Sequence, residues 1–277
     1  MDWAKEWESA HQRSPLRVTK ENERRWQGFW SECAVQYGME VEAERPLYQK
    51  VIDYLAKERV LKHSDTVMDV GCGPGTYTIL AARRAKRVVG LDSSRGMTEE
   101  MLRQAQRVGL NNVDAMVIRF EDLGIGKYDL VLSALSPAVR DYAGLSRMER
   151  LSRRHCCYIT SSYGEEMITR NELWELLIGK FSPTYAYDVS YPLNILLSER
   201  KRPNLKFVSD RVRISMDSEM VIRNFHSYFG IFIEMTPEKR LLIRDYIEQR
   251  SSQGIFVREF KKDLAIMTWD VRDGPST

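Results

Sequence analysis

Residues 67–76 read Val-Met-Asp-Val-Gly-Cys-Gly-Pro-Gly-Thr, and residues 87–92 read Arg-Val-Val-Gly-Leu-Asp. An apolar run, a glycine-dense turn, a helix-like stretch and a second apolar run that ends in a carboxylate predict a β-α-β unit. The glycines allow the backbone to approach a ligand closely, because no Cβ intrudes and positive φ costs little. Asp92 follows about 20 residues after Gly71, where its carboxylate can accept hydrogen bonds from both hydroxyls of a ribose. The pattern therefore predicts a site for a nucleoside-bearing cofactor.

The spacing of the glycines indicates which cofactor. The dinucleotide fingerprint is G-x-G-x-x-G, in which the last glycine lets the helix pack closely with its N-terminus toward a pyrophosphate. Gly71, Gly73 and Gly75 are instead spaced G-x-G-x-G. This spacing resembles motif I of the class I S-adenosylmethionine-dependent methyltransferases, whose cofactor carries a ribose and a methionine but no phosphate.

Three further segments continue the resemblance in the same order. Residues 92–97 (Asp-Ser-Ser-Arg-Gly-Met) resemble the second motif of that family, in which an acid precedes small residues and a Met that packs on the adenine. Residues 120–122 (Phe-Glu-Asp) fall where the family places an aromatic side chain beside the adenine, and residues 128–133 resemble its fourth strand. The resemblance spans roughly residues 65–163.

This resemblance implies a fold and a cofactor. The expected fold is α/β: a Rossmann-like, doubly wound, seven-stranded sheet, mostly parallel with an antiparallel last strand, together with an N-terminal helical lid and a helical substrate cap. The expected cofactor is S-adenosyl-L-methionine. The residues expected to contact it are Tyr37, Asp69, Gly71, Cys72, Gly73, Gly75, Asp92, Ser93, Met97, Phe120, Glu121 and Ser133.

One position departs from the family pattern. Many relatives carry an Asp that accepts a hydrogen bond from the adenine amino group, whereas this chain has Arg119, which can only donate. Glu121 or a backbone carbonyl would then be the acceptor.

Composition limits the classes of protein to be considered. Of the 277 residues, 43% are hydrophobic and 29% charged, as in a globular protein, and the net charge of +3 is too small to indicate a nucleic-acid partner. There is no long uncharged apolar run and no signal-like N-terminus. The four cysteines form no metal-type C-x-x-C pair, so we expect no metal site and a reduced, cytoplasmic protein.

The pattern along the chain predicts three parts: an N-terminal lid (1–60), a cofactor-binding core (61–163), and a substrate cap that also supplies the last strands of the sheet (164–277). In the lid we expect helices over residues 3–38 and 46–60. In the core, strands at 67–70, 87–91, 113–118, 128–133 and 156–161 alternate with helices at 76–85, 97–108 and 141–153. This alternation favours a parallel sheet with its ligand at the carboxyl ends of the strands.

The last part is expected to be largely helical. Helices are predicted at 169–181, near 192–199, after Asp217, and after Thr236-Pro237-Glu238, where a cap, a proline and an acid follow one another. Residues 205–214 and 264–271 are expected to be the sixth and seventh strands. Residues 255–260 and 264–271 are expected to form a pair of strands around Lys261-Lys262-Asp263.

The chemistry of methyl transfer requires the acceptor, methyl carbon and sulfur to be held in line, and a base only for a weakly acidic acceptor. The sequence assigns no catalytic residue. His226 and Tyr187 are the candidates, with a structural role as the alternative for each. Tyr185, Tyr187 and Tyr191 are expected to line the acceptor pocket, and Tyr163 is a further candidate. Residues 136–138 (Ser-Pro-Ala) do not match the motif of the DNA amino-methyltransferases, which argues against exocyclic base amines.

Three functions remain open. The first is methylation of a small molecule, with no membrane or nucleic-acid partner and with a homodimer as one oligomeric state to consider. The second is methylation of RNA or protein. It is supported by the basic clusters at 83–87, 147–154 and 199–202. The third is a catalytically silent, cofactor-binding regulatory subunit, because no base is evident.

Overall fold

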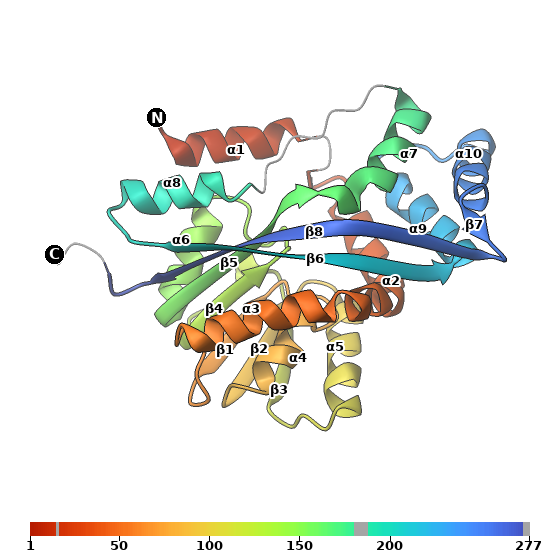
Figure 1. Cartoon of the computed structure of the whole chain (residues 1–277). Coiled ribbons are helices and arrows are strands. Elements are labelled where there is room, and N and C mark those ends of the chain that lie inside the picture. The colour runs from red at the N-terminus through yellow and green to blue at the C-terminus, as the bar shows by residue number, and fades with distance from the viewer. Residues whose placement is uncertain (15–16, 180–187, 274–277) are drawn as a thin grey trace.

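The fold is built on one mixed β-sheet with helices on both faces (Figure 1). A computed structural model describes residues 1–14, 17–179 and 188–273. Within these ranges the strand order is β3-β2-β1-β4-β5-β8-β6, and β7 pairs with β8. The strands are β1 (Thr66–Val70), β2 (Arg87–Asp92), β3 (Val113–Val117), β4 (Tyr128–Ala134), β5 (Ser152–Gly164), β6 (Asn204–Asp217), β7 (Ser251–Ser252) and β8 (Ile255–Asp270).

The helices form two layers and a separate group at one end of the sheet. Their bounds are α1 (Trp3–Arg13), α2 (Glu23–Ala43), α3 (Arg45–Lys57), α4 (Thr76–Ala82), α5 (Arg95–Arg107), α6 (Tyr142–Leu151), α7 (Ile168–Ile178), α8 (Ser190–Ser198), α9 (Ser218–Gly230) and α10 (Pro237–Glu248). Helices α3, α4 and α5 cover one face, and α1, α6 and α8 cover the other (Figure 1). Each layer has its own apolar core, so the sheet is buried on both sides.

The direction of the strands confirms the predicted fold class. Strands β1 to β5 are parallel to their neighbours, and β8 is antiparallel to both β5 and β6. Strand β1 is buried from Val67 to Val70 and β4 from Leu130 to Ser133, and both are mostly apolar there because parallel strands covered on both faces must be apolar on both. The carboxyl ends of β1, β2 and β4 therefore lie at the same end of the sheet, next to the glycine turn.

The predicted pair of strands at 255–260 and 264–271 is wrong, because β8 runs without a break from Ile255 to Asp270. Lys261-Lys262-Asp263 resembles a polar turn in the sequence. In the structure these three residues pair with Arg211, Asp210 and Ser209 of β6, and the charge of Lys262 is neutralised by Glu44. A buried ion pair, which the local sequence does not reveal, keeps the strand continuous.

The predicted N-terminal helical region (3–38) is divided into α1 and α2. Thr19 and Asn22 exchange hydrogen bonds between them, since the Thr19 amide donates to Asn22 Oδ1 at 2.8 Å. Helix α1 packs against α8 and α6, whereas α2 packs against α5. The division of the chain at residues 60 and 163 stays a prediction.

Beyond β5, strands β6 and β8 continue as a long two-stranded arm (Figure 1). A third apolar core, formed by α7, α9, α10 and one face of α2, packs on this arm. The two predicted helix caps are confirmed: Asp217 accepts from the Met220 amide, and Thr236 accepts from the Lys239 amide. The arm and its helices lie at the same end of the sheet as α2.

Candidate active site

The turn between β1 and α4 is fixed by hydrogen bonds to the neighbouring strand. The amides of Gly71 and Cys72 both donate to the Leu91 carbonyl, at 2.7 and 3.0 Å. A Cβ built on Gly71 would lie 1.8 Å from Ser136 Oγ, so the turn can pack against the loop after β4 only with glycine at this position. The backbone of the turn is thereby held at the carboxyl end of the sheet.

Asp92 lies at the end of β2 with its carboxylate held in one orientation. Its Oδ2 accepts from the Gly73 amide at 3.0 Å, and its Oδ1 accepts from the Ser94 amide at 2.8 Å. Burial raises the pKa of this carboxyl, and hydrogen bonds from backbone amides oppose that rise. Each oxygen retains a lone pair on the pocket side, so the group can accept from two further donors.

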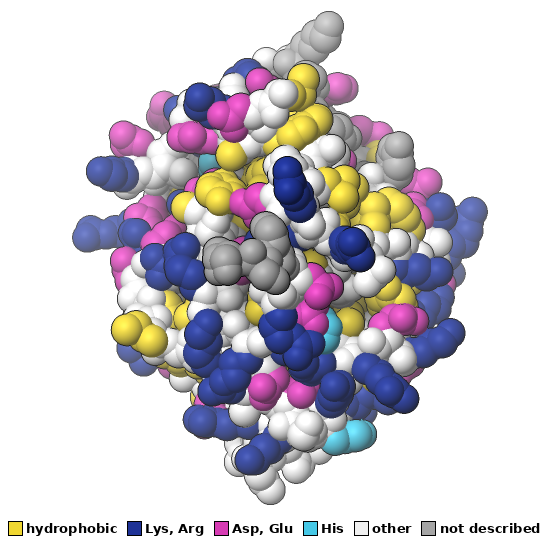
Figure 2. Space-filling view, turned by 90° about the vertical axis from the view of Figure 1, so that its left-hand side faces the viewer, with side chains coloured by type: hydrophobic (Ala, Val, Ile, Leu, Met, Phe, Trp, Pro, Cys, Tyr) yellow, Lys and Arg dark blue, Asp and Glu magenta, His cyan; other side chains and the backbone are white. Residues whose placement is uncertain are grey.

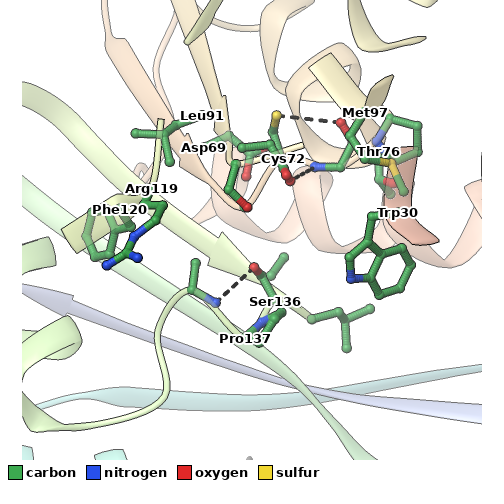
Figure 3. Close-up of a pocket in the computed structure, with 18 of the residues that line it drawn as sticks. Trp30, Asp69, Cys72, Thr76, Leu91, Met97, Arg119, Phe120, Ser136 and Pro137 are labelled. Atoms are coloured by element: carbon green, nitrogen blue, oxygen red, sulfur yellow. Dashed lines mark hydrogen bonds between the residues drawn. The ribbon is translucent and has the colours of Figure 1, made fainter. Parts of the chain in front are cut away.

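A pocket opens beside this carboxylate (Figure 3). Its lining includes ten of the predicted cofactor residues, namely Tyr37, Asp69, Gly71, Cys72, Gly73, Asp92, Ser93, Met97, Phe120 and Glu121. Segments far apart in the sequence contribute them: α2, the β1–α4 turn, the end of β2, the first turns of α5 and the segment after β3. The structure therefore brings most of the predicted site into one cavity.

Two of the predicted cofactor residues, Ser133 and Gly75, are not among the residues that line the pocket. Ser133 is 1% exposed and donates its hydroxyl to the Val70 carbonyl, so it ties β4 to β1 instead of lining the pocket. Gly75 is the N-cap of α4, and a Cβ there would lie 2.7 Å from the side chain of Met101. The close approach at Gly75 is between two helices of the protein, not between the protein and a ligand.

Two groups in the turn have shifted pKa values. Burial raises the pKa of Asp69 to about 6, although the Thr78 hydroxyl donates to its Oδ2 at 2.6 Å. Burial also raises the pKa of the Cys72 thiol well above its usual value. Cys72 is therefore a neutral thiol at physiological pH, in line with a small pocket-wall residue and not a nucleophile.

Helix α2 lies over the pocket and contributes to its lining, besides the predicted Tyr37, residues that were not among the predicted cofactor contacts. Glu23, Trp26, Gln27, Trp30 and Tyr37 line the pocket from one side of this helix. Their spacing of three, four and seven residues is the signal that could have identified them. The sequence predicted an N-terminal helical lid, with an aromatic face that packs on the sheet as the alternative, and Trp26 and Trp30 stack on each other with ring centroids 6.0 Å apart.

The contact between α2 and α5 is unusually close. A Cβ on Gly96 would lie 2.7 Å from the Ser31 carbonyl oxygen, and the hydroxyls of Ser31 and Ser94 lie 2.9 Å apart. Gly96 therefore allows α2 to rest directly on the first turn of α5. This contact between α2 and α5 fixes the position of α2 relative to the pocket.

Ion pairs surround the other end of the pocket. Arg119 contacts Glu23 of α2 at 3.0 Å and Asp122 at 3.2 Å, while Arg140 contacts Glu121 at 3.0 Å. The Arg119 side chain, which departs from the family pattern, thus links α2 to the segment after β3. Its charge and that of Arg140 are both paired with carboxylates.

The predicted catalytic candidates do not converge on the pocket. His226 is on α9, its Nε2 lies 3.2 Å from the Arg240 carbonyl, and it is not among the residues that line the cavity. Tyr191 stacks on Trp7 with ring centroids 6.4 Å apart, so its assignment to the pocket is wrong. Tyr185 and Tyr187, as well as the Tyr163 side chain, lie outside the described part of the structure. His226 was a catalytic candidate on sequence grounds. In the structure its helix, α9, packs on the arm formed by β6 and β8.

Comparison with known proteins identifies the class of this domain. Residues 67–154, which run from β1 into β5, match the family described as "Methyltransferase domain". The YcgJ protein of Bacillus subtilis has a similar fold, with a TM-score of 0.51, 15% identity, and coverage of 80% of this chain and 98% of that one. Residues 67–154 are therefore a methyltransferase domain, and the protein is a methyltransferase with S-adenosylmethionine as its cofactor.

Two sequence relatives differ in how much of their length is matched. An uncharacterized protein of Haemophilus influenzae is 21% identical over 251 residues, covering 87% of this chain and 88% of the relative. The 23S rRNA (uracil(1939)-C(5))-methyltransferase RlmD of Vesicomyosocius okutanii is 35% identical over 74 residues. That match covers 27% of this chain and only 17% of RlmD. No helix within the described ranges combines the length and the apolar character that a membrane span requires.

Proposed function

We propose that this methyltransferase transfers the methyl group of S-adenosylmethionine to a small-molecule acceptor bound in the pocket beneath α2. The observation that carries the proposal is that helix α2 lies over the pocket and lines it with three aromatic side chains, those of Trp26, Trp30 and Tyr37. Aromatic side chains along one wall of a pocket suit a small, partly apolar ligand. In Figure 3 the Trp30 ring lies on the opposite side of the cavity from Phe120.

The residues of the pocket fit the cofactor. The two oxygens of Asp92 would accept hydrogen bonds from the ribose hydroxyls, and the backbone from Gly71 to Gly73 would lie along the methionine part. Space is available there, since a Cβ on Gly73 would meet no atom within 4 Å. When bound, the cofactor supplies an activated methyl group. The protein holds the acceptor in line with it, an effect worth about 7–11 kcal/mol in favourable cases.

The positions of the basic residues support a small molecule over RNA. The clusters at 83–87, 147–154 and 199–202 precede or begin β2, β5 and β6, at the edge of the sheet opposite the glycine turn. Figure 2 views the molecule from that side and shows many Lys and Arg side chains, especially in its lower half. RNA methylation requires positive charge around the pocket entrance, where Arg119 and Arg140 are already paired with carboxylates.

Methyl transfer from labelled S-adenosylmethionine to two fractions of a cell extract, small molecules and total RNA, tests the proposal. We expect label in the small-molecule fraction only. Label in RNA would favour the alternative, and tight binding without turnover in either fraction would favour a silent regulatory subunit. A cytoplasmic location and a homodimer stay predictions.

The Asp92→Ala variant tests the assignment of the ribose site. Hydrogen bonds to a charged acceptor contribute roughly 1.5–3 kcal/mol, so affinity for S-adenosylhomocysteine should fall about ten- to a hundredfold. Asp114→Ala, which removes an exposed carboxylate paired with Arg87, is the matched control. Wild-type affinity of Asp92→Ala in calorimetry would contradict the assignment.

A further inference from the structure

The buried end of the pocket is lined by two tyrosines from different helices. Tyr48 of α3 and Tyr77 of α4 are 1% and 3% exposed, and their ring centroids lie 5.2 Å apart. Both line the same cavity as Asp69 and Trp30. The Tyr77 hydroxyl is buried and has no hydrogen-bond partner within the described part of the chain. A buried hydroxyl without a partner costs free energy, so a ligand group that pairs with it gains affinity.

The Tyr48 hydroxyl, by contrast, is fixed by a buried ion pair. Lys262 Nζ donates to Glu44 Oε2 at 2.7 Å and to the Tyr48 hydroxyl oxygen at 3.0 Å, and Tyr48 donates its own proton to Glu44. Lys262 is on β8 and Glu44 is between α2 and α3. Because the Tyr48 proton is already given to Glu44, Tyr48 can only accept a hydrogen bond from a ligand.

These hydrogen-bond roles select the ligand group. A carboxylate cannot donate to Tyr48, whereas an amine or ammonium can donate both to Tyr48 and to Tyr77. The charge of Lys262 is already paired with Glu44, and the carboxyl of Asp69 lines the same pocket. Burial, followed by the neighbouring Cys157, Glu44 and Asp69, raises the pKa of Tyr77, so this residue stays a neutral hydroxyl. The aromatic rings nearby favour a cation as well.

We propose that the hydroxyls of Tyr48 and Tyr77 form a subsite for an amino group of a pocket ligand. The inference rests on the proposed function, and it narrows the acceptor to an amine-bearing small molecule. The same chemistry could be supplied by the α-ammonium group of the cofactor. The Lys262–Glu44 pair acts as a positioning element that orients the Tyr48 hydroxyl.

Calorimetry on the complex with S-adenosylhomocysteine tests the subsite with benzylamine and benzoate, two probes of similar size and opposite charge. We expect benzylamine to bind more tightly than benzoate. The Tyr77→Phe and Tyr48→Phe variants should weaken benzylamine about tenfold, as expected for the loss of one hydrogen bond to a cation. Tyr191→Phe is the control, because Tyr191 stacks on Trp7 outside the pocket.

A second set of binding measurements distinguishes the two possible sources of the amino group, the cofactor and the acceptor. If the subsite holds the cofactor's own ammonium, the tyrosine variants weaken S-adenosylhomocysteine but not its analogue without the α-amino group. If it holds the acceptor, both cofactor analogues bind as they do to the wild type and only benzylamine is weakened. The inference is overturned if the variants match the wild type for every probe, or if benzoate binds as tightly as benzylamine while the variants bind both cofactor analogues as the wild type does. These measurements use binding alone, so transfer of methyl groups to RNA would refute the proposed function without deciding the subsite.

Discussion

At the scale of single residues, the glycines of the β1–α4 turn have different roles. Gly71 leaves room for Ser136, and Gly75 leaves room for Met101, whereas Gly73 faces open space in the pocket. Only Gly73 is therefore in a position where an added side chain would meet the ligand and nothing else. This difference follows from the packing around each glycine and is not visible in the G-x-G-x-G spacing.

Gly73→Ala should weaken cofactor binding far more than it alters folding. Its φ of +54° is a left-handed conformation, in which a side chain costs roughly 1–2 kcal/mol of stability. Gly109→Ala is a matched control, because Gly109 has a φ of +73°, also faces open space, and lies outside the pocket. Thermal unfolding should show similar losses in both variants. Calorimetry should show a loss of S-adenosylhomocysteine affinity of about tenfold or more in Gly73→Ala alone, and equal affinities would contradict the role of Gly73.

Asp69 should make the ligand-free protein less stable as the pH rises. Its pKa is raised from 3.8 to about 6 by burial, so between these values the folded carboxyl keeps a proton that the unfolded one has lost. Below pH 4 this carboxyl does not reduce the free energy of unfolding. As the pH rises past 6, the free energy of unfolding falls by at most about 3 kcal/mol. Asp69→Asn should remove this part of the pH dependence of the unfolding free energy. Urea titrations at pH 4 to 7 measure it, with Asp114→Asn as the exposed control, and an unchanged slope in Asp69→Asn would refute the prediction.

At the scale of elements, the pocket depends on how α2 rests on α5. Ser31 of α2 lies against Gly96 and Ser94 of α5, and Glu23 at the start of α2 is paired with Arg119. These contacts place the aromatic side chains of α2 over the strand ends. The helix is therefore a structural part of the binding site, although it contains none of the glycine or carboxylate motifs.

Gly96→Ala should lift α2 from α5 without unfolding the sheet. The new Cβ would lie within 3 Å of the Ser31 backbone, which must move away. We expect faster trypsin cleavage at Arg24 and Arg25 and about tenfold weaker cofactor binding, since a tenfold change corresponds to only 1.4 kcal/mol. Gly28→Ala is the control within α2, where a Cβ meets nothing within 4 Å and should stabilise the helix by about 0.5–1 kcal/mol. Identical proteolysis of both variants would show that the contact does not hold α2 in place.

At the scale of the whole molecule, one buried ion pair connects the two ends of the chain. Lys262 of β8 pairs with Glu44, and both residues contact Tyr48 beneath the pocket. The N-terminal helices are thereby joined to the last strand of the sheet. Most of the basic clusters lie at the opposite end of the strands, although Arg147 reaches the ring of the pocket-lining Phe120 at 5.8 Å.

Lys262→Met should destabilise the protein by about 3–5 kcal/mol, because it leaves the Glu44 carboxylate buried without its partner. Glu44 is only 6% exposed, so water cannot replace the lost interaction. The double variant Lys262→Met/Glu44→Gln should recover most of the loss, since no unpaired charge remains. Chemical denaturation of both variants is the measurement. A double variant no more stable than Lys262→Met would mean that the charge of Glu44 is not the cause.

Much of the fold and part of the site could be predicted from local sequence. Strands β1, β2 and β4 are short, mostly apolar segments, as is typical of buried parallel strands. Asp92 is the last residue of β2. The helix caps at Asp217 and Thr236 were also predictable, because capping depends on residues only three positions apart. All these features are set by neighbours in the sequence.

By itself, the sequence determined the class of the enzyme, its cofactor and the position of the Asp92 carboxylate at the end of β2, because those depend on short motifs with characteristic spacing. Only the tertiary structure decided that Trp26 and Gln27 of α2 line the pocket, that His226 and Tyr191 are not part of its lining, and that Ser133 ties two strands together. It also decided that Tyr48 contacts both Lys262 and the ring of Tyr77. The physical reason is that such contacts join residues from distant parts of the chain, and no local pattern of polarity records which partner a side chain will find.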